Sequence, residues 1–288
     1  MSARAVYTAL FGSYESLNED QASADGVDFL CFTDNPELTS ERWQVVVVEP
    51  VFPLDPHRSQ RRLKIVGHPA LDAYEQTLYI DNTVSLTGDV HGLFDEFLGS
   101  ADMAMAKHSF RANVALEFAA VWRDGLDDPH RVMEQWDHYA TSWPEILEGP
   151  VLWGGMIARR RGEAVTSLGH TWFEHVLRYS RRDQLSAPVA LALHPEVDVA
   201  MRDWDNQSSA WHRWPVEVER NHAMRSGGAA MRVPLDLKPI LETHDRLQLL
   251  EWEFARALGE LNAMKSSASW RLTAPLRRVR AWRRRTSQ

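Results

Sequence analysis

Residues 76–82 read Gln76-Thr77-Leu78-Tyr79-Ile80-Asp81-Asn82, an apolar run that ends on a carboxylate and an amide. The run predicts a buried strand followed by a loop, because aliphatic and aromatic side chains suit a sheet whereas Asp and Asn commonly stop strands. In an open α/β sheet, ligands bind beyond the carboxyl ends of the strands. The carboxylate of Asp81 is therefore the first candidate for a ligand-binding group.

Similar apolar runs come before and after this stretch. They lack a clean alternation of polar and apolar residues, which is expected of strands covered on both faces. Segments with helical spacing of apolar residues separate them, so the chain predicts an α/β fold in which helices flank a sheet. The predicted strands are 5–11, 28–34, 43–48, 76–81, 101–108 and 150–159, and the predicted helices are 58–74, interrupted at Pro69, 114–123, 131–140 and 171–179.

The composition is that of a globular protein with one large core. The chain has 288 residues, of which 44% are hydrophobic and 25% charged, which is enough for one catalytic-size α/β domain plus an extension. Its single cysteine, Cys31, lies in an apolar run; this excludes a disulfide framework within the chain and predicts a reducing compartment. The chain starts without an apolar signal region, which predicts a cytoplasmic location.

The formal net charge of −8 conceals an uneven distribution. Residues 265–288 carry one lysine, seven arginines and no acid, so removing their charge of +8 leaves −16 on residues 1–264. We therefore predict three parts, namely a catalytic domain at 1–235, an amphipathic helix at 236–264 and a basic tail at 265–288.

Apolar side chains in residues 244–264 recur at alternating spacings of three and four, which predicts one long amphipathic helix. Packing of this helix against the domain and a homodimeric coiled coil through 244–264 both fit the pattern. The apolar positions are Leu247, Leu250, Phe254, Ala257, Leu261 and Met264.

The basic tail interleaves large apolar residues with its arginines. This pattern suits an anionic membrane surface, where lipid-linked acceptors are held, and predicts a peripheral protein at the inner face of the membrane. A disordered tail and a tail that docks on the acidic domain are the other interpretations. Nucleic acid is not a predicted partner, because the rest of the chain is acidic. The apolar residues concerned are Trp270, Leu276, Val279 and Trp282.

Polar residues mark three of the predicted strands. Thr8 lies within the first strand, Thr33 and Asp34 close the second, and Asp81 and Asn82 close the fourth. Asp34 suits a ribose or a uracil edge, whereas Asp81 suits a divalent cation that bridges diphosphate oxygens. Each carboxylate on its own also fits a turn that ends a strand.

Cationic residues lie between the second and fourth strand ends. Arg58, Arg61 and Lys64 would compensate the charge of a diphosphate, for which guanidinium groups supply paired donors. A solvated helix face explains the same residues without a ligand. Lys107 and His108 end the next predicted strand and would face a sugar or a phosphate.

The order of these segments resembles the GT-A glycosyltransferases, in particular a glycosyltransferase-like family with plant mucilage and bacterial polysaccharide members that was formerly a domain of unknown function. The resemblance covers about residues 5–200 and implies a GT-A-like, Rossmann-like mixed sheet flanked by helices. The segments that carry it are Tyr7-Thr8-Ala9-Leu10-Phe11-Gly12-Ser13-Tyr14-Glu15, Phe32-Thr33-Asp34-Asn35, Arg58-Ser59-Gln60-Arg61-Arg62-Leu63-Lys64, Tyr79-Ile80-Asp81-Asn82, Trp153-Gly154-Gly155-Met156-Ile157 and Arg182-Asp183-Gln184.

The resemblance also implies roles for individual residues. Asp81 would lie at the metal–diphosphate centre, and Asp183-Gln184 would close over the transferred sugar. Tyr7, Thr8 and Asp34 would touch the nucleoside, Arg61 and Lys64 the diphosphate region, and Gly154 and Gly155 would line the acceptor side. Beyond the resemblance, we predict that the donor side also includes Thr33, Arg58, Tyr79, Asn82, Lys107 and His108, and the acceptor side Trp153, Trp172, Glu174 and Gln184.

One departure concerns the metal. Many GT-A enzymes have Asp-x-Asp at this strand end, but here Thr83 stands at the third position. Either Asp81 binds Mg or Mn together with water and phosphate oxygens, or Arg61, Lys64 and Lys107 stabilise the leaving diphosphate without a metal.

We therefore expect a glycosyltransferase that moves a sugar from a nucleotide-sugar donor to a cell-surface polysaccharide or glycolipid acceptor. An inverting reaction needs a base, for which Asp183 is the first choice and Glu174 the second; Glu174 also fits an exposed helix position. The segment Ser269-Trp270-Arg271-Leu272-Thr273-Ala274-Pro275-Leu276-Arg277 resembles tails that follow bacterial polysaccharide glycosyltransferases. The alternatives are a non-catalytic glycan-binding or scaffold protein and a metal-dependent hydrolase.

Overall fold

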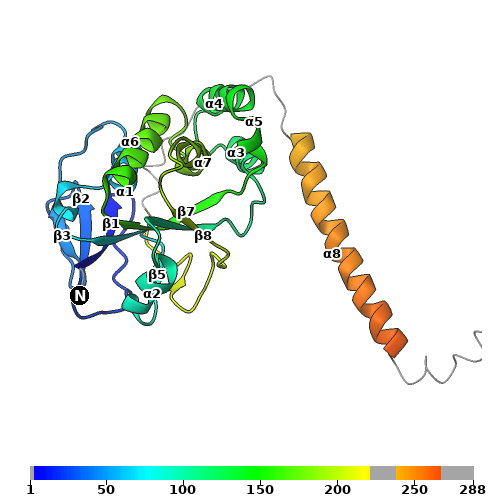
Figure 1. The fold of residues 1–288 in the computed structure, drawn as a ribbon, viewed down its shortest axis with the longest axis horizontal. Helices are drawn as coiled ribbons and strands as arrows, with labels where there is room; N and C mark the ends of the chain where they lie inside the picture. The colour runs from blue at the N-terminus through cyan, green and yellow to red at the C-terminus, as the bar shows by residue number, and fades with distance from the viewer. Residues whose placement is uncertain (1–2, 221–237, 267–288) are drawn as a thin grey trace, which may run out of the picture. The chain divides into compact units, whose positions relative to one another are not determined.

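The computed structural model describes residues 3–220 and 238–266 (Figure 1). The chain divides into two compact units, Met1–Leu235 and Asp236–Gln288, and each unit is described by itself. Most of the basic tail predicted at 265–288 lies outside the described residues.

The first unit is built on a seven-stranded sheet with the order β3-β2-β1-β4-β7-β6-β8. Strand β7 runs antiparallel to both of its neighbours, whereas the other neighbouring strands are parallel. This arrangement confirms the predicted α/β fold with a mixed sheet. The strands are β1 (Arg4–Leu10), β2 (Val27–Thr33), β3 (Gln44–Val47), β4 (Gln76–Ile80), β6 (Met103–Lys107), β7 (Leu152–Arg160) and β8 (Val199–Arg202), and a separate pair is formed by β5 (Ser85–Leu86) and β9 (His212–Arg213).

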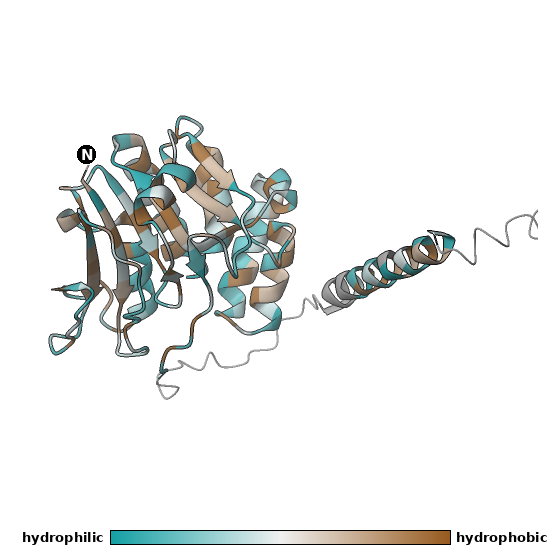
Figure 2. Cartoon of the chain, turned by 90° about the horizontal axis from the view of Figure 1, so that it is seen from below, coloured by the Kyte–Doolittle hydropathy of each residue, from teal (hydrophilic) through white to brown (hydrophobic). Residues whose placement is uncertain are grey.

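Helices cover both faces of the sheet (Figure 1), and hydrophobic residues are concentrated in the strands between them (Figure 2). Alternate residues of β1 point to opposite faces, so Tyr7 packs with the core on one side and Val6 with the core on the other. The helices of the first unit are α1 (Pro56–Val66), α2 (Val90–Phe97), α3 (Val114–Arg123), α4 (Pro129–Ser142), α5 (Pro144–Glu148), α6 (Glu163–Arg178) and α7 (Asp183–Leu193), with a 3₁₀ turn η1 (Pro69–Leu71).

Helix α1 shows how local sequence sets the element boundaries. Asp55 caps its start by accepting a hydrogen bond from the backbone N–H of Arg58, and Pro56 occupies the first turn. The helix ends at Gly67, whose φ of +87° suits a residue without a side chain. Pro69 then starts the separate turn η1, which confirms the predicted interruption.

Most predicted elements are present, and the differences have local causes. Helix α3 has the predicted bounds and is capped by Asn113. Helix α6 begins eight residues before the predicted start at 171, because Val165 and Leu168 extend its buried face. Helix α7 was not predicted, since Pro188 lies inside it and a proline usually argues against a helix interior.

The strand order places a switch point between β1 and β4. Strand β1 pairs in parallel with β2 on one side and with β4 on the other. The carboxyl ends of these strands therefore open side by side, which is where open α/β sheets bind ligands.

The second unit contributes one helix to the described residues, α8 (Lys238–Ser266). It covers residues 238–264 of the amphipathic helix predicted at 236–264, and residues 236–237 lie outside the described residues. No helix in the described part of the chain is both long enough and apolar enough to cross a membrane.

Candidate functional site

Three elements bring charged side chains together beside the carboxyl end of β4, and a fourth passes close to them. Helix α1 contributes Arg61 and Lys64, the residue after β4 is Asp81, and α7 begins with Asp183. Strand β7, which pairs with β4, contributes Gly154. The candidate site therefore combines segments that are far apart in the sequence.

The centre of the site is a buried ion cluster. Lys64 Nζ lies 2.8 Å from Asp183 Oδ2 and 3.4 Å from Asp81 Oδ1, and Arg61 Nε lies 3.1 Å from Asp183 Oδ1. The side chains of Lys64 and Asp183 are only 2% and 3% exposed, whereas that of Asp81 is 33% exposed. Asp81 is thus the carboxylate of the cluster that faces solvent.

Gly154 is required by the close approach of this cluster. A Cβ atom at Gly154 would lie 2.8 Å from Lys64 Nζ and 3.0 Å from Asp183 Oδ2. A Cβ at Gly155 would lie 2.2 Å from the indole ring of Trp153, which folds over it. Each glycine of the Trp-Gly-Gly segment thus makes room for a neighbouring side chain.

Asp81 is held by the backbone and by a buried tyrosine. Its N–H donates to Gly155 O at 2.8 Å, and its Oδ1 accepts a 2.8 Å hydrogen bond from the Tyr79 hydroxyl. That hydroxyl accepts in turn from Gln60 Nε2 at 2.5 Å. Burial, and next the Asp81 carboxylate, raise the pKa of Tyr79 well above its usual value, so the phenol stays protonated and keeps donating.

Asp183 is ion-paired with two cations, although the geometry at its buried Oδ2 does not make a hydrogen bond within the described residues. Burial alone would raise the pKa of its carboxyl, but the neighbouring Arg61 and Lys64 outweigh that effect and hold the pKa well below its usual range. Both carboxylate oxygens face a cation within 3.1 Å. These contacts suit a residue that positions Arg61 and Lys64 better than one that accepts a proton.

A second buried carboxylate lies nearby on α3. Glu117 is 4% exposed, and its Oε2 lies 3.6 Å from Arg111 Nε. Burial raises the pKa of Glu117 despite the opposing charges of Arg182 and Arg111. The same two arginines add to burial in lowering the pKa of His108 to about 4. The charges of Arg111 and Arg182 therefore act on both Glu117 and His108.

The residues predicted after β2 serve the adjoining loop. Both carboxylate oxygens of Asp34 accept from the backbone N–H of Gly12, at 3.0 and 3.2 Å. Gly12 has φ +74°, which favours glycine, and a Cβ there would lie 3.0 Å from Pro56. Thr33 is buried, and its hydroxyl accepts from the N–H of Asn35.

Asn82 also holds a loop in place. Its Oδ1 accepts from the N–H of Asn18 at 2.9 Å, and its Nδ2 donates to Ser16 O at 2.8 Å and to Glu15 Oε2 at 3.2 Å. With the residue 8% exposed, its amide is committed to the loop between β1 and β2. The structure gives Asn82 a structural role, and its contact with a donor stays a prediction.

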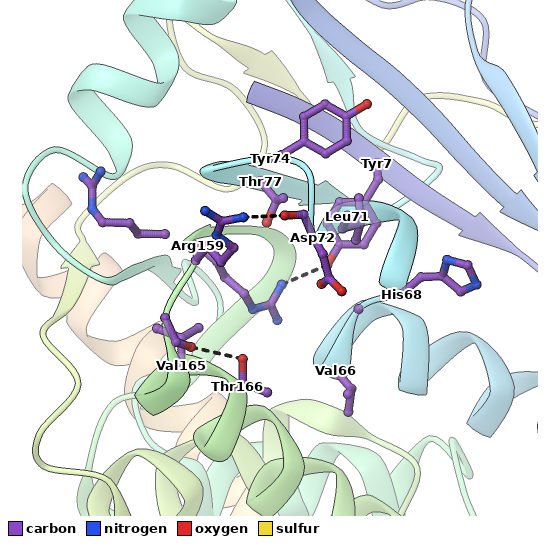
Figure 3. A pocket seen from close by; sticks show the side chains of 14 residues that line it. Tyr7, Val66, His68, Leu71, Asp72, Tyr74, Thr77, Arg159, Val165 and Thr166 are labelled. Carbon is purple, nitrogen blue, oxygen red and sulfur yellow. Dashed lines mark hydrogen bonds between the residues drawn. The ribbon is translucent and has the colours of Figure 1, made fainter. Parts of the chain in front are cut away.

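Tyr7 was predicted to touch a nucleoside but is a core residue. It is 1% exposed, and its hydroxyl donates to Lys64 O at 3.3 Å and accepts from Arg159 Nη1 at 3.0 Å. It borders a cavity of about 90 Å³ with Thr77 and Arg159 (Figure 3). Thr77 lies near the start of β4 and pairs with Arg159. The cavity therefore lies toward the amino end of β4, whereas Asp81 follows its carboxyl end.

The neighbouring Thr8 is also buried, at 1% exposure. Its hydroxyl forms no hydrogen bond within the part of the chain that the structure describes. The structure therefore gives no contact that ties Thr8 to a ligand.

Arg58 and Lys107 are paired away from the ion cluster. Arg58 forms an ion pair with Asp55 at 2.7 Å and donates to the backbone oxygens of Val176 and Tyr179, so it joins α1 to α6. Lys107 Nζ lies 2.9 Å from Asp203 Oδ1 in an exposed pair. These contacts give Arg58 a structural role, and its predicted donor binding stays a prediction.

Among the predicted acceptor residues, Trp153 and Trp172 are buried, whereas Glu174 is exposed. Trp153 packs against His212 and Trp214, with ring centroids 5.4 Å apart in each pair. Trp172 is buried, and its Nε1 donates to Asp183 O at 2.9 Å, which supports the start of α7. Glu174 is exposed on α6, which agrees with its alternative interpretation as a helix surface residue.

Gln184 and Arg182 form a further polar contact at the start of α7. Arg182 Nη2 donates to Gln184 Oε1 at 3.2 Å. Sequence reasoning missed the parts played by Gln60, Glu117 and Arg182. Gln60 has its partner, Tyr79, in another segment, and the effect of Arg182 on Glu117 joins two separate helices. Glu117 itself has the sequence context of an ordinary helix residue in 114–123.

The site does not form a metal centre from protein groups alone. In the ranges 3–220 and 238–266, no group of three or more His, Cys, Asp or Glu side chains is arranged to hold a metal ion. The groups that contact Asp81 Oδ1 are an ammonium and a phenol. A divalent cation would have to arrive with its other ligands, such as the phosphate oxygens of a donor.

Comparison with known proteins gives one family match. A family model described as TOD1/MUCI70, glycosyltransferase-like domain, matches residues 30–208, which is more than half of the chain. No curated protein matches. Among solved structures, a crystal structure of core-mannan synthase A from Aspergillus fumigatus in its Mn/GDP form shares 12% sequence identity, with a TM-score of 0.38; the similarity covers 66% of this chain and 70% of that chain.

Proposed function

We propose that the chain, which belongs to the TOD1/MUCI70 glycosyltransferase-like domain family, transfers a sugar from a nucleotide-sugar donor to a glycan or lipid-linked acceptor. The family membership confirms the resemblance drawn from the sequence. The observation that carries the proposal is the solvent-facing Asp81, set beside the buried Lys64–Asp183–Arg61 cluster at the switch point of the sheet.

The proposed reaction breaks the bond between the anomeric carbon and the donor diphosphate while an acceptor hydroxyl bonds to that carbon. Negative charge develops on the departing diphosphate and needs fixed positive groups. Arg61, whose side chain is 16% exposed, is the cation of the cluster that reaches solvent. Asp183 keeps the guanidinium and the Lys64 ammonium in place, so their charge needs no rearrangement during the reaction.

Glu117 replaces Asp183 as the proposed base for an inverting reaction. A base works best with a pKa near the working pH, and burial shifts the pKa of Glu117 upward. Asp183 has its pKa shifted downward by two cations. The acceptor proton would therefore pass to a Glu117 oxygen as the acceptor oxygen attacks.

The proposed steps do not pass through a metal. If Mg or Mn accompanies the donor, Asp81 is the protein ligand, and the cation would add charge compensation at the diphosphate. Because Lys64 already contacts Asp81 Oδ1 at 3.4 Å, the protein itself supplies positive charge at this position.

A donor screen tests the proposal. We expect one of UDP-glucose, UDP-N-acetylglucosamine, UDP-galactose or GDP-mannose to raise the melting temperature and to be hydrolysed slowly, with or without MnCl₂. The matched control is Asp203→Asn, which removes an exposed carboxylate from the pair with Lys107. Absence of both binding and hydrolysis for all four probes would overturn the proposal and leave a non-catalytic glycan-binding protein as the better interpretation.

A further inference from the structure

Helix α8 exposes an apolar face that nothing in its own unit covers among the described residues. The exposed fractions are 55% for Leu247, 50% for Leu250 and 70% for Phe254. Figure 2 shows hydrophobic residues interspersed with hydrophilic ones along this helix. Large apolar side chains exposed at this density mark a contact surface.

The residues of this face follow a heptad, whereas the exposed Leu249, Trp252 and Leu258 lie outside its a and d positions. With Leu247 at position a, Phe254 and Leu261 also occupy a, and Leu250 and Ala257 occupy d. A seam of a and d residues packs against another helix with the same repeat. A second copy of this chain supplies such a helix.

The flanking charges select the orientation of that copy. In a parallel, in-register pair, a residue at g faces the partner's residue at e in the next heptad. Arg246 then faces the partner's Glu251, and Glu260 faces the partner's Lys265; symmetry produces each attraction twice. An antiparallel pair aligned on the same seam would instead place Glu253 against the partner's Glu260, which repels.

Other occupants fit the helix less well. The range Lys238–Ser266 contains four basic and five acidic residues, so it has no positive excess to attract anionic lipid. Glu260 also pairs with Arg256 within the helix at 3.1 Å, and both side chains remain exposed.

We propose that α8 forms a parallel, in-register two-stranded coiled coil with α8 of a second copy of the chain. The apolar seam from Leu247 to Met264 covers fewer than three heptads, so the dimer is expected to dissociate on dilution. The proposal is independent of the glycosyltransferase activity.

Sedimentation equilibrium of the full chain over a concentration series tests the proposal. We expect a monomer–dimer equilibrium that Leu261→Lys shifts to monomer and that Gln248→Ala, at an outward position, leaves unchanged. Arg246→Glu is expected to weaken the dimer at least several-fold, and the double variant Arg246→Glu/Glu251→Arg to restore it. A chain that stays monomeric at every concentration overturns the proposal, as does association that Leu261→Lys leaves intact.

Cross-linking tests the orientation separately. In a parallel, in-register pair, Leu250→Cys places two thiols opposite each other at position d, so mild oxidation is expected to yield a covalent dimer. The native Cys31 is buried, which makes the unaltered chain the matched control. A dimer in solution that Leu250→Cys cannot cross-link overturns the parallel arrangement. Binding to phosphatidylserine vesicles by the helix without self-association overturns the choice of partner.

Discussion

Two carboxylates follow the strands on either side of β1, yet their side chains make different contacts. Asp34, after β2, gives both oxygens to the backbone N–H of Gly12. Asp81, after β4, is held through Oδ1 by Tyr79 and Lys64 and keeps a third of its side chain exposed. The sequence pattern of the two strand ends is similar, but only Asp81 stands beside a buried ion cluster.

The comparison shows that a strand-ending carboxylate becomes a candidate ligand group through its neighbours. Asp34 shapes the Gly12 turn, and its hydrogen bonds stabilise the fold. Asp81 is oriented by buried groups and presented to solvent, which are the conditions for preorganised electrostatics. The predictions below test this division of roles.

The largest expected effect is on turnover at Asp81. Asp81→Asn is expected to lower hydrolysis of the active nucleotide sugar by about 10²–10³-fold, the range found when one preorganised electrostatic group is lost. Its melting temperature is expected to change little, because the side chain is partly exposed. The measurement is single-turnover hydrolysis, and near-normal rates in Asp81→Asn would remove Asp81 from the mechanism.

Loss of Lys64 is expected to affect folding most. Lys64→Met leaves Asp183 buried with Arg61 as its remaining partner in the cluster, and removing one member of a buried ion pair costs about 3 kcal/mol. Urea unfolding measures the change. Lys107→Met is the control, since its exposed pair with Asp203 is worth about 1 kcal/mol or less; equal losses for the two variants would contradict the buried cluster.

Glu117→Gln is expected to raise stability at neutral pH while it lowers transfer activity. Burial raises the folded-state pKa of Glu117, so the ionised form destabilises the fold as the pH rises above the unfolded-state pKa. Below the unfolded-state pKa, the Glu117 carboxyl is neutral in both the folded and the unfolded parent. The variant and the parent are therefore expected to have equal stability in acid. At pH 7 the variant is expected to be more stable, while transfer by an inverting enzyme falls by about 10²-fold.

Unfolding curves at acid and neutral pH, together with transfer assays, check the Glu117 prediction. A variant that loses stability at pH 7 would show that the carboxylate is needed by Arg111 or Arg182 for folding. Full transfer activity would remove Glu117 as the base.

The smallest effect is expected at Asp34. Asp34→Asn keeps one oxygen for the Gly12 N–H and loses the other acceptor and the charge, which costs about 1 kcal/mol. Hydrolysis per folded molecule is expected to stay within a few-fold of the parent. A loss as large as that of Asp81→Asn would erase the distinction between the two strand ends and return Asp34 to the donor site.

The six predicted strands are all present, because each is an apolar run bounded by polar or glycine residues. The short strands β5, β8 and β9 were missed, since they lack such a run. Helix α3 was predicted with its bounds, since Asn113 caps a clear apolar pattern. Helix α7 was missed because Pro188 lies inside it, and there tertiary contacts override local preference. The family resemblance was confirmed, whereas the three-part division of the chain stays a prediction.

The site was predicted only in part. Arg61, Lys64, Asp81 and Asp183 were all named as candidates, and the fold brings them together. Their pairing was not predictable, because no periodicity or spacing links α1 to the start of α7. The burial of Tyr7 was not foreseen, since an aromatic residue on a strand has the same sequence pattern whether it faces the core or a ligand.

The burial of Lys64 makes the site observable by magnetic resonance. An ammonium that is 2% exposed and lies between two carboxylates exchanges its protons with water far more slowly than a surface lysine. Its nitrogen signal is therefore expected to be resolved in isotope-labelled protein, and to shift when a diphosphate reaches Asp81. Donor arrival can then be followed in the absence of any acceptor, on a single atom of the chain.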